Sequence, residues 1–439
     1  MNTFKSLLWI LAFLAAAGFS YFIPPMQSPD EMSHIERAYL ISKGRFFLEK
    51  LPTVLVNGPR KYAEDAAFME RARQHGGPIG GMVDQGLLQY IAFNFELVLD
   101  YNRKFSDSEN NQISKIKWAS NEEYHVLPGA GYYFPAIYTP QALGFSIGRL
   151  FDLNVGNSYY LARGLVLAAC FALFWLASRL LTPNPLAVAI LFLPMSMFQM
   201  LSPTIDGLTT ALAVLACSLF MAAADLSRGH PRFSSWGLAL CVFILATART
   251  HTLPLLVLPF YIAWVRRSPR DLYLGCTATA ATLGWVLYAM NSTNDPRVAQ
   301  ESFIGILGWL DTKLPHFFYP TLWLGLAICA LVGISWHTLQ RDWFPRLLLI
   351  GVALTSVCLI FLALLLTWTP HPTSLVQGVQ GRYFVVPMIL LAYSVSGFAV
   401  FRGPTHRVLT WVVLAGFALT ALTALMMALF SRYGSAAVS

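Results

Sequence analysis

Apolar residues recur along the chain in runs close to the length of a membrane-spanning helix, which needs about 20 residues. Short polar segments separate these runs. The pattern predicts an all-α polytopic membrane protein with about eleven transmembrane helices. We place them at residues 6–23, 159–177, 186–200, 205–224, 235–248, 253–265, 272–290, 317–336, 347–366, 384–400 and 408–430.

One long polar stretch, residues 24–157, interrupts this pattern. It is too polar to cross a bilayer and too long for a plain connector. We interpret it as a small, mostly helical extramembrane module within a single domain of residues 1–439. Its last part, 131–150, is apolar enough to suggest a further span. However, Pro135, Pro140 and several tyrosines favour an interfacial or re-entrant helix.

The basic residues of the short loops fall on alternating sides. One side carries Lys5, Arg179, Arg228, Arg232, Arg266, Arg267, Arg270, Arg341, Arg346, Arg402 and Arg407. The other side carries Arg249, Arg297, Lys313, Arg382 and Arg432. The positive-inside rule assigns the first set and the N-terminus to the cytoplasm. Making 131–150 a full span would spoil this bias, so we expect it at the outer surface with the rest of the large loop.

Two predicted spans, 235–248 and 253–265, are short for a bilayer of about 30 Å. Arg249 and His251 lie between them. The pattern favours a helical hairpin whose tip carries both side chains to about membrane depth.

Composition supports the membrane assignment and narrows the partners. The chain is 56% hydrophobic and 12% charged, against about 25% charged in soluble proteins. Its net charge of +8 does not indicate nucleic-acid binding, because the basic residues lie mostly in loops, where they set orientation. The six cysteines all fall in apolar segments and are expected to be small buried residues. The first segment lacks a clear cleavage site, and we expect a retained anchor.

A charged stretch follows the first apolar segment at residues 28–44. Ser28, Pro29 and Glu31 have the spacing of a capped helix start, with the acid three residues after the cap. Structural capping is therefore one interpretation of this stretch. It is compatible with a second interpretation, in which the stretch carries functional groups.

The second interpretation comes from helical spacing. Asp30, His34 and Arg37 are four and three residues apart, so one helix places them along one face. Glu31 lies beside Asp30. Ionisable groups at bilayer depth are costly and are candidates for function.

The predicted topology gathers further candidates on the outer face. The set comprises Asp30, Glu31, His34, Arg37, Asp206, Arg249, His251, Glu301, Asp311, Lys313, His371, Gln380, Arg382 and Tyr383. A carboxylate can take a proton from an attacking hydroxyl, and arginines hold phosphates with forked hydrogen bonds. Simpler interpretations stay open: Asp206 as a helix cap, Arg249 and His251 as a helix end, and Arg382 with Tyr383 as an interfacial anchor. No spacing predicts a metal site.

Three motifs carry a family resemblance: SPDE with the residues after it, ILGWLDTKLP, and QGRYF. They resemble a family of uncharacterised bacterial polytopic membrane proteins, which in turn looks like the GT-C superfamily of lipid-phosphate-sugar-dependent glycosyltransferases. The resemblance implies that Asp30 and Glu31 are the acidic pair of the first outer loop, with a carboxylate as the catalytic base. It also implies that Asp206 is the acid of the second outer loop and that Arg249 faces the donor phosphate.

The chain ends soon after residue 430, so we expect no large soluble C-terminal domain of the oligosaccharyltransferase branch. Because that branch is the clearest metal user, a divalent cation stays possible and no other cofactor is expected.

We therefore expect a glycosyltransferase of the bacterial inner membrane with its active site on the extracytoplasmic face. It would move a sugar from a polyprenyl-phosphate donor to a cell-envelope glycan or glycolipid. Asp30 is the predicted general base and Glu31 its partner. The predicted substrate-binding residues are His34, Arg37, Asp206, Arg249, His251, Gln380, Arg382 and Tyr383.

Two alternatives stay open. A lipid-linked sugar flippase or transporter would also need buried charges, but it usually shows internal repeats and charges at the bilayer midplane. A noncatalytic scaffold would not need Asp30, Asp206, Arg249 and Arg382 to converge on one cavity.

Overall fold

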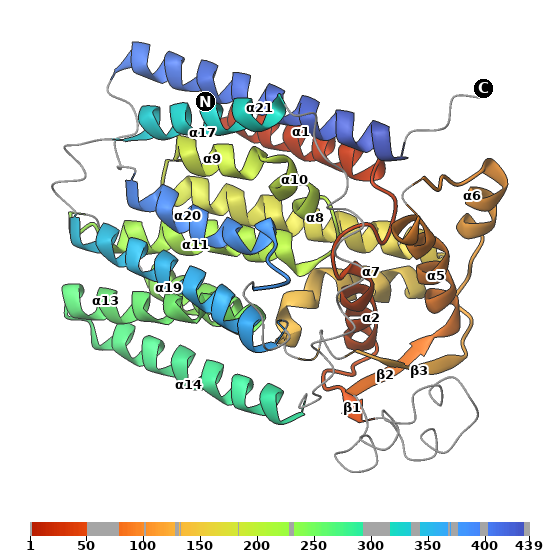
Figure 1. Ribbon diagram of the computed structural model, residues 1–439. Coiled ribbons are helices and arrows are strands. Elements are labelled where there is room, and N and C mark those ends of the chain that lie inside the picture. The colour runs from red at the N-terminus through yellow and green to blue at the C-terminus, as the bar shows by residue number, and fades with distance from the viewer. Residues whose placement is uncertain are drawn as a thin grey trace. The chain divides into compact units, whose positions relative to one another are not determined.

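The computed structural model describes residues 2–50, 79–100, 102–127, 131, 133–182, 184–227, 232–292, 317–334, 343–367, 369, 376–395 and 403–433. Most of these residues are helical (Figure 1). The chain divides into two compact units. We call residues 1–23, 167–283 and 310–439 the helix unit, and residues 24–166 and 284–309 the loop unit.

The helix unit is built from long apolar helices and short helical breaks. Its elements are α1 (Asn2–Tyr21), α8 (Val155–Leu180), α9 (Pro185–Phe192), α10 (Pro194–Met200), α11 (Ile205–Ala224), α12 (Arg232–Ala248), η2 (Thr250–Leu256), α13 (Val257–Arg266), α14 (Pro269–Ser292), α17 (Phe318–Gly333), α19 (Trp343–Thr367), η3 (Gly381–Phe384), α20 (Val385–Val395) and α21 (Pro404–Tyr433). The start of α8 and the end of α14 belong to the loop unit.

Each of the eleven predicted apolar segments contains helix, but the helices differ in length. Five described helices are long and apolar enough to cross a membrane: α8, α11, α14, α19 and α21. The other predicted spans stay predictions. Segment 186–200 is two short helices, because Pro194 begins a new helix and cannot continue the hydrogen-bond ladder of α9.

The helix unit packs around α11. Of the 18-residue apolar stretch of this helix, 89% is buried. Helices α10, α12, α13 and α20 contact it. Small residues along α11, such as Ala211 and Ala216, are fully buried and let neighbouring backbones approach closely. A second cluster joins α9, α17 and α21, which lie side by side in Figure 1. There Phe417 packs so tightly on Gly325 that a Cβ at this glycine would lie 2.4 Å from the ring.

The six cysteines are free thiols. Four of them are buried, but Cys276 and Cys358 are exposed. The expectation that all six are buried was therefore wrong for these two. They lie on α14 and α19, and an apolar run alone does not distinguish a helix face that packs inward from one that faces outward.

The loop unit combines short helices with a small sheet. Its elements are α2 (Glu31–Ser42), β1 (Glu49–Lys50), β2 (Ile79–Asp84), α5 (Gln85–Leu99), α6 (Asp107–Ser114), β3 (Glu122–Val126), η1 (Pro135–Tyr138) and α7 (Thr139–Leu150). The strands pair antiparallel in the order β1-β2-β3, with Gly80 opposite Val126 and Asp84 opposite Glu122.

The sequence did not predict this sheet, because its strands are short and β2 carries two consecutive glycines, Gly80 and Gly81, in place of an alternating pattern. Gly80 is required there by close packing. A Cβ at this position would lie 1.9 Å from the carbonyl oxygen of His125 on the neighbouring strand.

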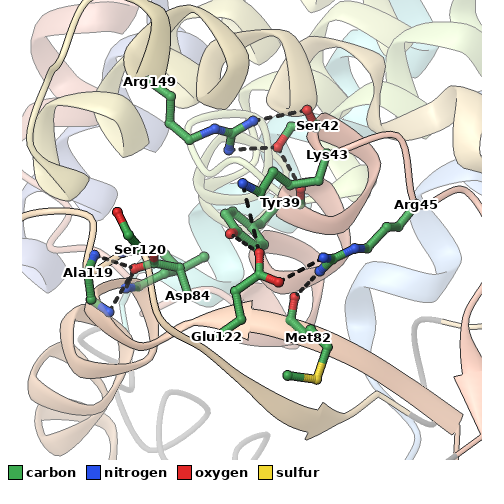
Figure 2. Close-up of polar contacts among 12 residues, drawn as sticks. Tyr39, Ser42, Lys43, Arg45, Met82, Asp84, Ala119, Ser120, Glu122 and Arg149 are labelled. Carbon is green, nitrogen blue, oxygen red and sulfur yellow. Dashed lines mark hydrogen bonds and ion pairs between the residues drawn. The ribbon is translucent and has the colours of Figure 1, made fainter.

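Within the predicted segment 131–150, residues 135–150 form η1 and α7. The 12-residue helix α7 is too short to cross a bilayer and instead packs on α2. Arg149 donates from Nη2 to the Ser42 carbonyl oxygen at 2.9 Å and from Nη1 to the Ser42 hydroxyl at 3.0 Å (Figure 2). This clamp fixes the C-terminal end of α2.

Two carboxylates tie the sheet to the helices of the loop unit (Figure 2). Glu122 on β3 accepts from the Tyr39 hydroxyl at 2.9 Å and from Arg45 Nη2 at 2.7 Å. Burial disfavours the ionised carboxyl of Glu122, but these hydrogen bonds outweigh it and hold the pKa of Glu122 below its usual range. Asp84 caps α5 and also accepts from the backbone N–H groups of Ala119 and Ser120.

Candidate functional site

The most concentrated group of charges in the described helix unit surrounds Asp206 at the start of α11. The cap of this helix is Thr204, whose hydroxyl accepts from the Asp206 backbone N–H at 3.4 Å. The alternative in which Asp206 caps α11 is therefore wrong. Its carboxylate instead stays available for side chains from elsewhere in the unit.

Two arginines bracket the Asp206 carboxylate. Arg249, directly before η2, donates from Nη2 to Oδ1, and Arg382 of η3 donates from Nη1 to Oδ2 at 3.2 Å. The side chain of Asp206 is 12% exposed, and that of Arg382 is 1% exposed. Three segments far apart in sequence thus meet at one carboxylate. We call Asp206, Arg249 and Arg382 the arginine clamp.

His251 and Tyr383 lie beside the arginine clamp. Their rings are 6.4 Å apart, and the guanidinium of Arg382 is 5.2 Å from the ring centre of Tyr383. His251 lies in η2, outside the candidate spans. Burial, helped by the charge of Arg249, lowers the pKa of His251 to about 3. The imidazole is therefore neutral at pH 7, and the charged groups described at this site are two guanidiniums and one carboxylate.

A narrow polar pocket opens at the clamp. The arginine clamp, His251 and Tyr383 line it together with residues that the sequence did not single out. Those residues are Ser196, Gln199, Thr209, Thr210, Val385 and Val386. Thr209 and Thr210 follow Asp206 by three and four residues, so helical periodicity was a usable signal for them. No comparable signal pointed to Ser196 or Gln199.

Gln380 precedes η3 and is buried. Neither of its amide atoms has a hydrogen-bond partner in the described chain. Two other residues of the QGRYF motif lie at the site: Arg382 is part of the arginine clamp, and Tyr383 lies beside it. Gln380 does not line the narrow pocket.

An apolar cavity of about 390 Å³ lies elsewhere in the helix unit. Side chains from α1, α8, α9, α10, α11, α20 and α21 line it. Three of these helices, α10, α11 and α20, also line the polar pocket. Helix α10 contributes Met197 and Met200 to the cavity and Gln199 to the pocket. Helix α11 contributes Val214 to the cavity and Asp206 to the pocket. Helices α10, α11 and α20 therefore each contribute side chains to both the apolar cavity and the polar pocket.

The loop unit contains the other predicted site residues, beginning with Glu31. Its carboxylate accepts from the backbone N–H groups of Met26 at 3.0 Å and Ser28 at 2.9 Å. It also accepts from the Tyr159 hydroxyl and pairs with Arg163 at 3.8 Å. Glu31 thus makes one half of a capping box with Ser28, although the helix begins one residue after Asp30.

Asp30 is the N-cap residue of α2, and its side chain does not cap the helix. Its φ of 55° places it in the left-handed region, which is uncommon for a residue with a side chain and recurs at functional positions. On the same helix, His34 Nδ1 lies 2.8 Å from the Tyr138 hydroxyl. Arg37 Nη2 donates to the Phe46 carbonyl oxygen at 2.6 Å.

The predicted site residues therefore divide between the units. The structure brings together Asp206, Arg249, His251, Arg382 and Tyr383, and the loop unit holds Asp30, Glu31, His34 and Arg37. Glu301, Asp311, Lys313 and His371 lie outside the described residues.

The described residues do not form an obvious cation site. No three histidine, cysteine, aspartate or glutamate side chains gather among them as metal ligands would. Both oxygens of Asp206 already accept from guanidiniums, so a divalent cation there would meet two positive groups. This donor set suits an anion better than a metal.

A family comparison agrees with the membrane assignment. The family described as predicted membrane protein (DUF2142) matches residues 13–302 and 299–392. A comparison with curated proteins finds no match. The family match extends over both the loop unit and the helix unit, including the arginine clamp. Since it covers well over half of the chain, the protein belongs to this DUF2142 family of predicted membrane proteins.

Proposed function

We propose that this protein is a membrane glycosyltransferase that takes a sugar from a polyprenyl-phosphate donor. The acceptor would be a cell-envelope glycan or glycolipid at the outer face of a bacterial inner membrane. The observation that carries the proposal is the arginine clamp in a narrow pocket, on helices that also line a large apolar cavity.

The charge of the clamp supports a phosphate-binding role. Arg249 and Arg382 place two guanidiniums at the carboxylate of Asp206. Guanidiniums hold phosphate oxygens with charge-assisted, forked hydrogen bonds. Their carboxylate partner keeps both groups oriented before a ligand arrives, which reduces the reorganisation needed on binding.

The apolar cavity supports a lipid-linked ligand. A free sugar nucleotide would gain nothing from a cavity lined almost entirely by apolar side chains, whereas a polyprenyl chain would bury apolar surface there at roughly 25 cal/mol per Å². Met197 and Met200 on its wall are flexible side chains that adapt to an irregular chain.

The proposed reaction needs one base and one stabilised leaving group. A carboxylate takes the proton of the acceptor hydroxyl as its oxygen attacks the anomeric carbon. A new carbon–oxygen bond to the acceptor forms while the bond from that carbon to the phosphate oxygen breaks, and the electron pair leaves with the polyprenyl phosphate. Positive charge near the departing phosphate lowers the barrier. Asp30 is our predicted base, and its left-handed backbone favours that role.

The test is a transfer assay in membranes that contain the full-length protein. Undecaprenyl-phosphate hexoses and pentoses, labelled in the sugar, are supplied with envelope glycans and glycolipids. We expect label to reach the acceptor with wild-type protein. Arg382→Gln, Arg249→Gln and Asp30→Asn should each lower transfer about 100-fold or more at matched expression.

Arg270→Gln is the matched control for removing an arginine. Arg270 donates to the Ser235 hydroxyl at 2.8 Å, away from the pocket, so transfer should stay near wild-type. If Arg382→Gln transfers as well as wild-type, the clamp does not hold the donor. If the lipid-linked sugar crosses the bilayer without transfer, a flippase explains the same pocket and the enzyme proposal is wrong.

A further inference from the structure

Arg37 on α2 is a buried cation without a counterion among the residues that the structure describes. It is 1% exposed, and its one hydrogen bond runs from Nη2 to the Phe46 carbonyl oxygen. Its Nε and Nη1 atoms, which carry more than half of the N–H donors of a guanidinium, make no hydrogen bond. Among the described residues, no ion pair includes it. By contrast, the buried Arg163 of the same unit pairs with Glu31.

The electrostatic surroundings of Arg37 contain phenols rather than acids. Burial lowers the pKa of its guanidinium, and the hydroxyls of Tyr138 and Tyr288 partly oppose that shift. Leaving a charge buried and uncompensated is strongly unfavourable. Such an arrangement indicates that an anion from outside the described chain completes it.

Aromatic rings of the loop unit form a continuous series that begins at Phe47, the residue after the Phe46 carbonyl group that binds Arg37. Phe47 meets Tyr288 with ring centres 5.4 Å apart, and Tyr288 meets Trp285 at 5.4 Å. Trp285 in turn contacts Phe134 edge-on at 5.0 Å. Phe47 is 59% exposed and Tyr288 is 40% exposed, so rings of this series face the surroundings.

A second group of rings includes His34 of α2. The ring of His34 lies 5.6 Å from that of Tyr133 and 5.7 Å from that of Tyr138. Tyr138 and Tyr288 are therefore the two rings that connect the aromatic series to the charge of Arg37. We call Phe47, Phe134, Trp285 and Tyr288 the aromatic strip.

We propose that the loop unit binds an acidic carbohydrate, whose anionic group pairs with Arg37 and whose sugar rings stack on the aromatic strip. Aromatic rings offer large, rigid faces with polar tips, which suit a ligand that is apolar on one face and hydroxylated at its edges. Arginine suits a carboxylate or a phosphate on such a sugar. Because Arg37 is buried, the anion reaches it by displacing a neighbouring ring, and the partly exposed Tyr288 is the residue placed for that movement.

A membrane-interface belt is the simpler explanation for the aromatic residues alone. Trp285 and Tyr288 lie near the end of the candidate span of α14, where such residues are enriched. An aromatic belt at the membrane interface does not require a buried arginine that lacks an acidic partner among the described residues. The charge of Arg37 therefore favours a specific anionic ligand.

This inference deepens the proposed function, because it identifies the acceptor as an acidic glycan. The role of that glycan as an acceptor rests on the proposed function. Binding of the glycan to the loop unit does not depend on it. Binding is measured without a donor, so a protein that binds the glycan but transfers no sugar would contradict only the transferase proposal.

The experiment measures binding of trigalacturonic acid, neutral galactotriose and a phosphorylated hexose to the full-length protein in nanodiscs. We expect at least one acidic ligand to bind at least tenfold more tightly than the neutral trisaccharide. Arg37→Met should abolish this preference, and Tyr288→Ala should weaken binding of the same ligand. Arg103→Gln removes an arginine that already pairs with Glu96 and Glu109, and it should bind like wild-type.

Thermal unfolding of the same variants separates a binding role from a structural one. Removal of an uncompensated buried charge should leave the unfolding temperature of Arg37→Met equal to that of wild-type or higher. Equal binding of acidic and neutral sugars, or unchanged binding by Arg37→Met, would overturn the proposal. So would loss of acidic-sugar binding in nanodiscs rich in phosphatidylglycerol but not in neutral ones, because a lipid headgroup would then occupy the site.

Discussion

Glu31 in the loop unit and Asp206 in the helix unit are two acids that each meet arginine, yet their surroundings differ. The side chain of Glu31 is 0% exposed, and it is satisfied by two backbone N–H groups, one phenol and one arginine. The side chain of Asp206 is 12% exposed and lines a pocket with two arginines.

The difference lies in the number of guanidiniums and in the space beside the carboxylate. Glu31 meets one guanidinium, and its side chain is fully buried. Asp206 meets two guanidiniums and lines a pocket. A buried acid gains a ligand-binding context from several cationic partners and open space, whereas burial alone is equally consistent with a structural clamp.

The largest expected effect comes from Glu31→Ala. The change leaves Arg163 buried without its carboxylate and removes the acceptor of the Met26 and Ser28 N–H groups. Breaking a buried pair on one side typically costs about 3–5 kcal/mol. We expect a marked fall in the thermal unfolding midpoint and in the yield of monodisperse protein after detergent extraction.

Glu96→Ala is the matched control, because Glu96 pairs with Arg103 at 2.6 Å but its side chain is 43% exposed. Exposed pairs contribute about 0–1 kcal/mol, so little change is expected. If Glu31→Ala and Glu96→Ala unfold at the same temperature, Glu31 is not a structural clamp and the contrast with Asp206 is lost.

An intermediate effect is expected from Asp206→Asn. This change removes the carboxylate that accepts from Arg249 and Arg382 and should destabilise the protein by about 1–3 kcal/mol. Inorganic phosphate should then raise the unfolding temperature of Asp206→Asn, since a ligand at 100 times its Kd stabilises by about 2.7 kcal/mol. Thermal scans with and without phosphate, at ionic strength matched with sodium chloride, provide the measurement.

Glu31→Gln should show no such phosphate response, because its site is closed and holds one guanidinium. A response of equal size in both variants would mean that phosphate acts on the whole protein, and the clamp would lose its status as an anion site.

The smallest effect concerns Glu122, whose side chain is 19% exposed. Its pKa is lower in the folded protein than the ordinary 4.5, so the unfolded chain takes up a proton first as the pH falls. The stabilisation is fully present above about pH 4.5 and is lost as the pH falls through the folded pKa. Unfolding temperatures between pH 6 and pH 3 should fall less steeply for Glu122→Gln than for wild-type. Parallel curves would show that Glu122 contributes nothing to acid sensitivity.

Several features followed from local sequence. Apolar run length predicted helix in every segment that we placed, and residues 135–150 form short helices rather than a long one. Helical spacing put His34 and Arg37 on α2, but it was wrong for Asp30, which is the N-cap residue in a left-handed conformation outside the helix. These features depend on residues within a few helical turns of one another. Hydrophobic periodicity and turn-forming residues reflect such local interactions, so the sequence predicts them.

Tertiary packing decided the rest. Glu31 and its partner Tyr159 are 128 residues apart, and Asp206 and Arg382 are 176 residues apart. Hydrophobic period carries no information about which distant segment will lie opposite a given side chain. The sequence by itself therefore determined where the acids and arginines stand along the chain. Only the folded structure decided which carboxylate meets one guanidinium, which meets two beside a pocket, and which buried cation has no acid partner among the described residues, because those outcomes depend on contacts between remote helices.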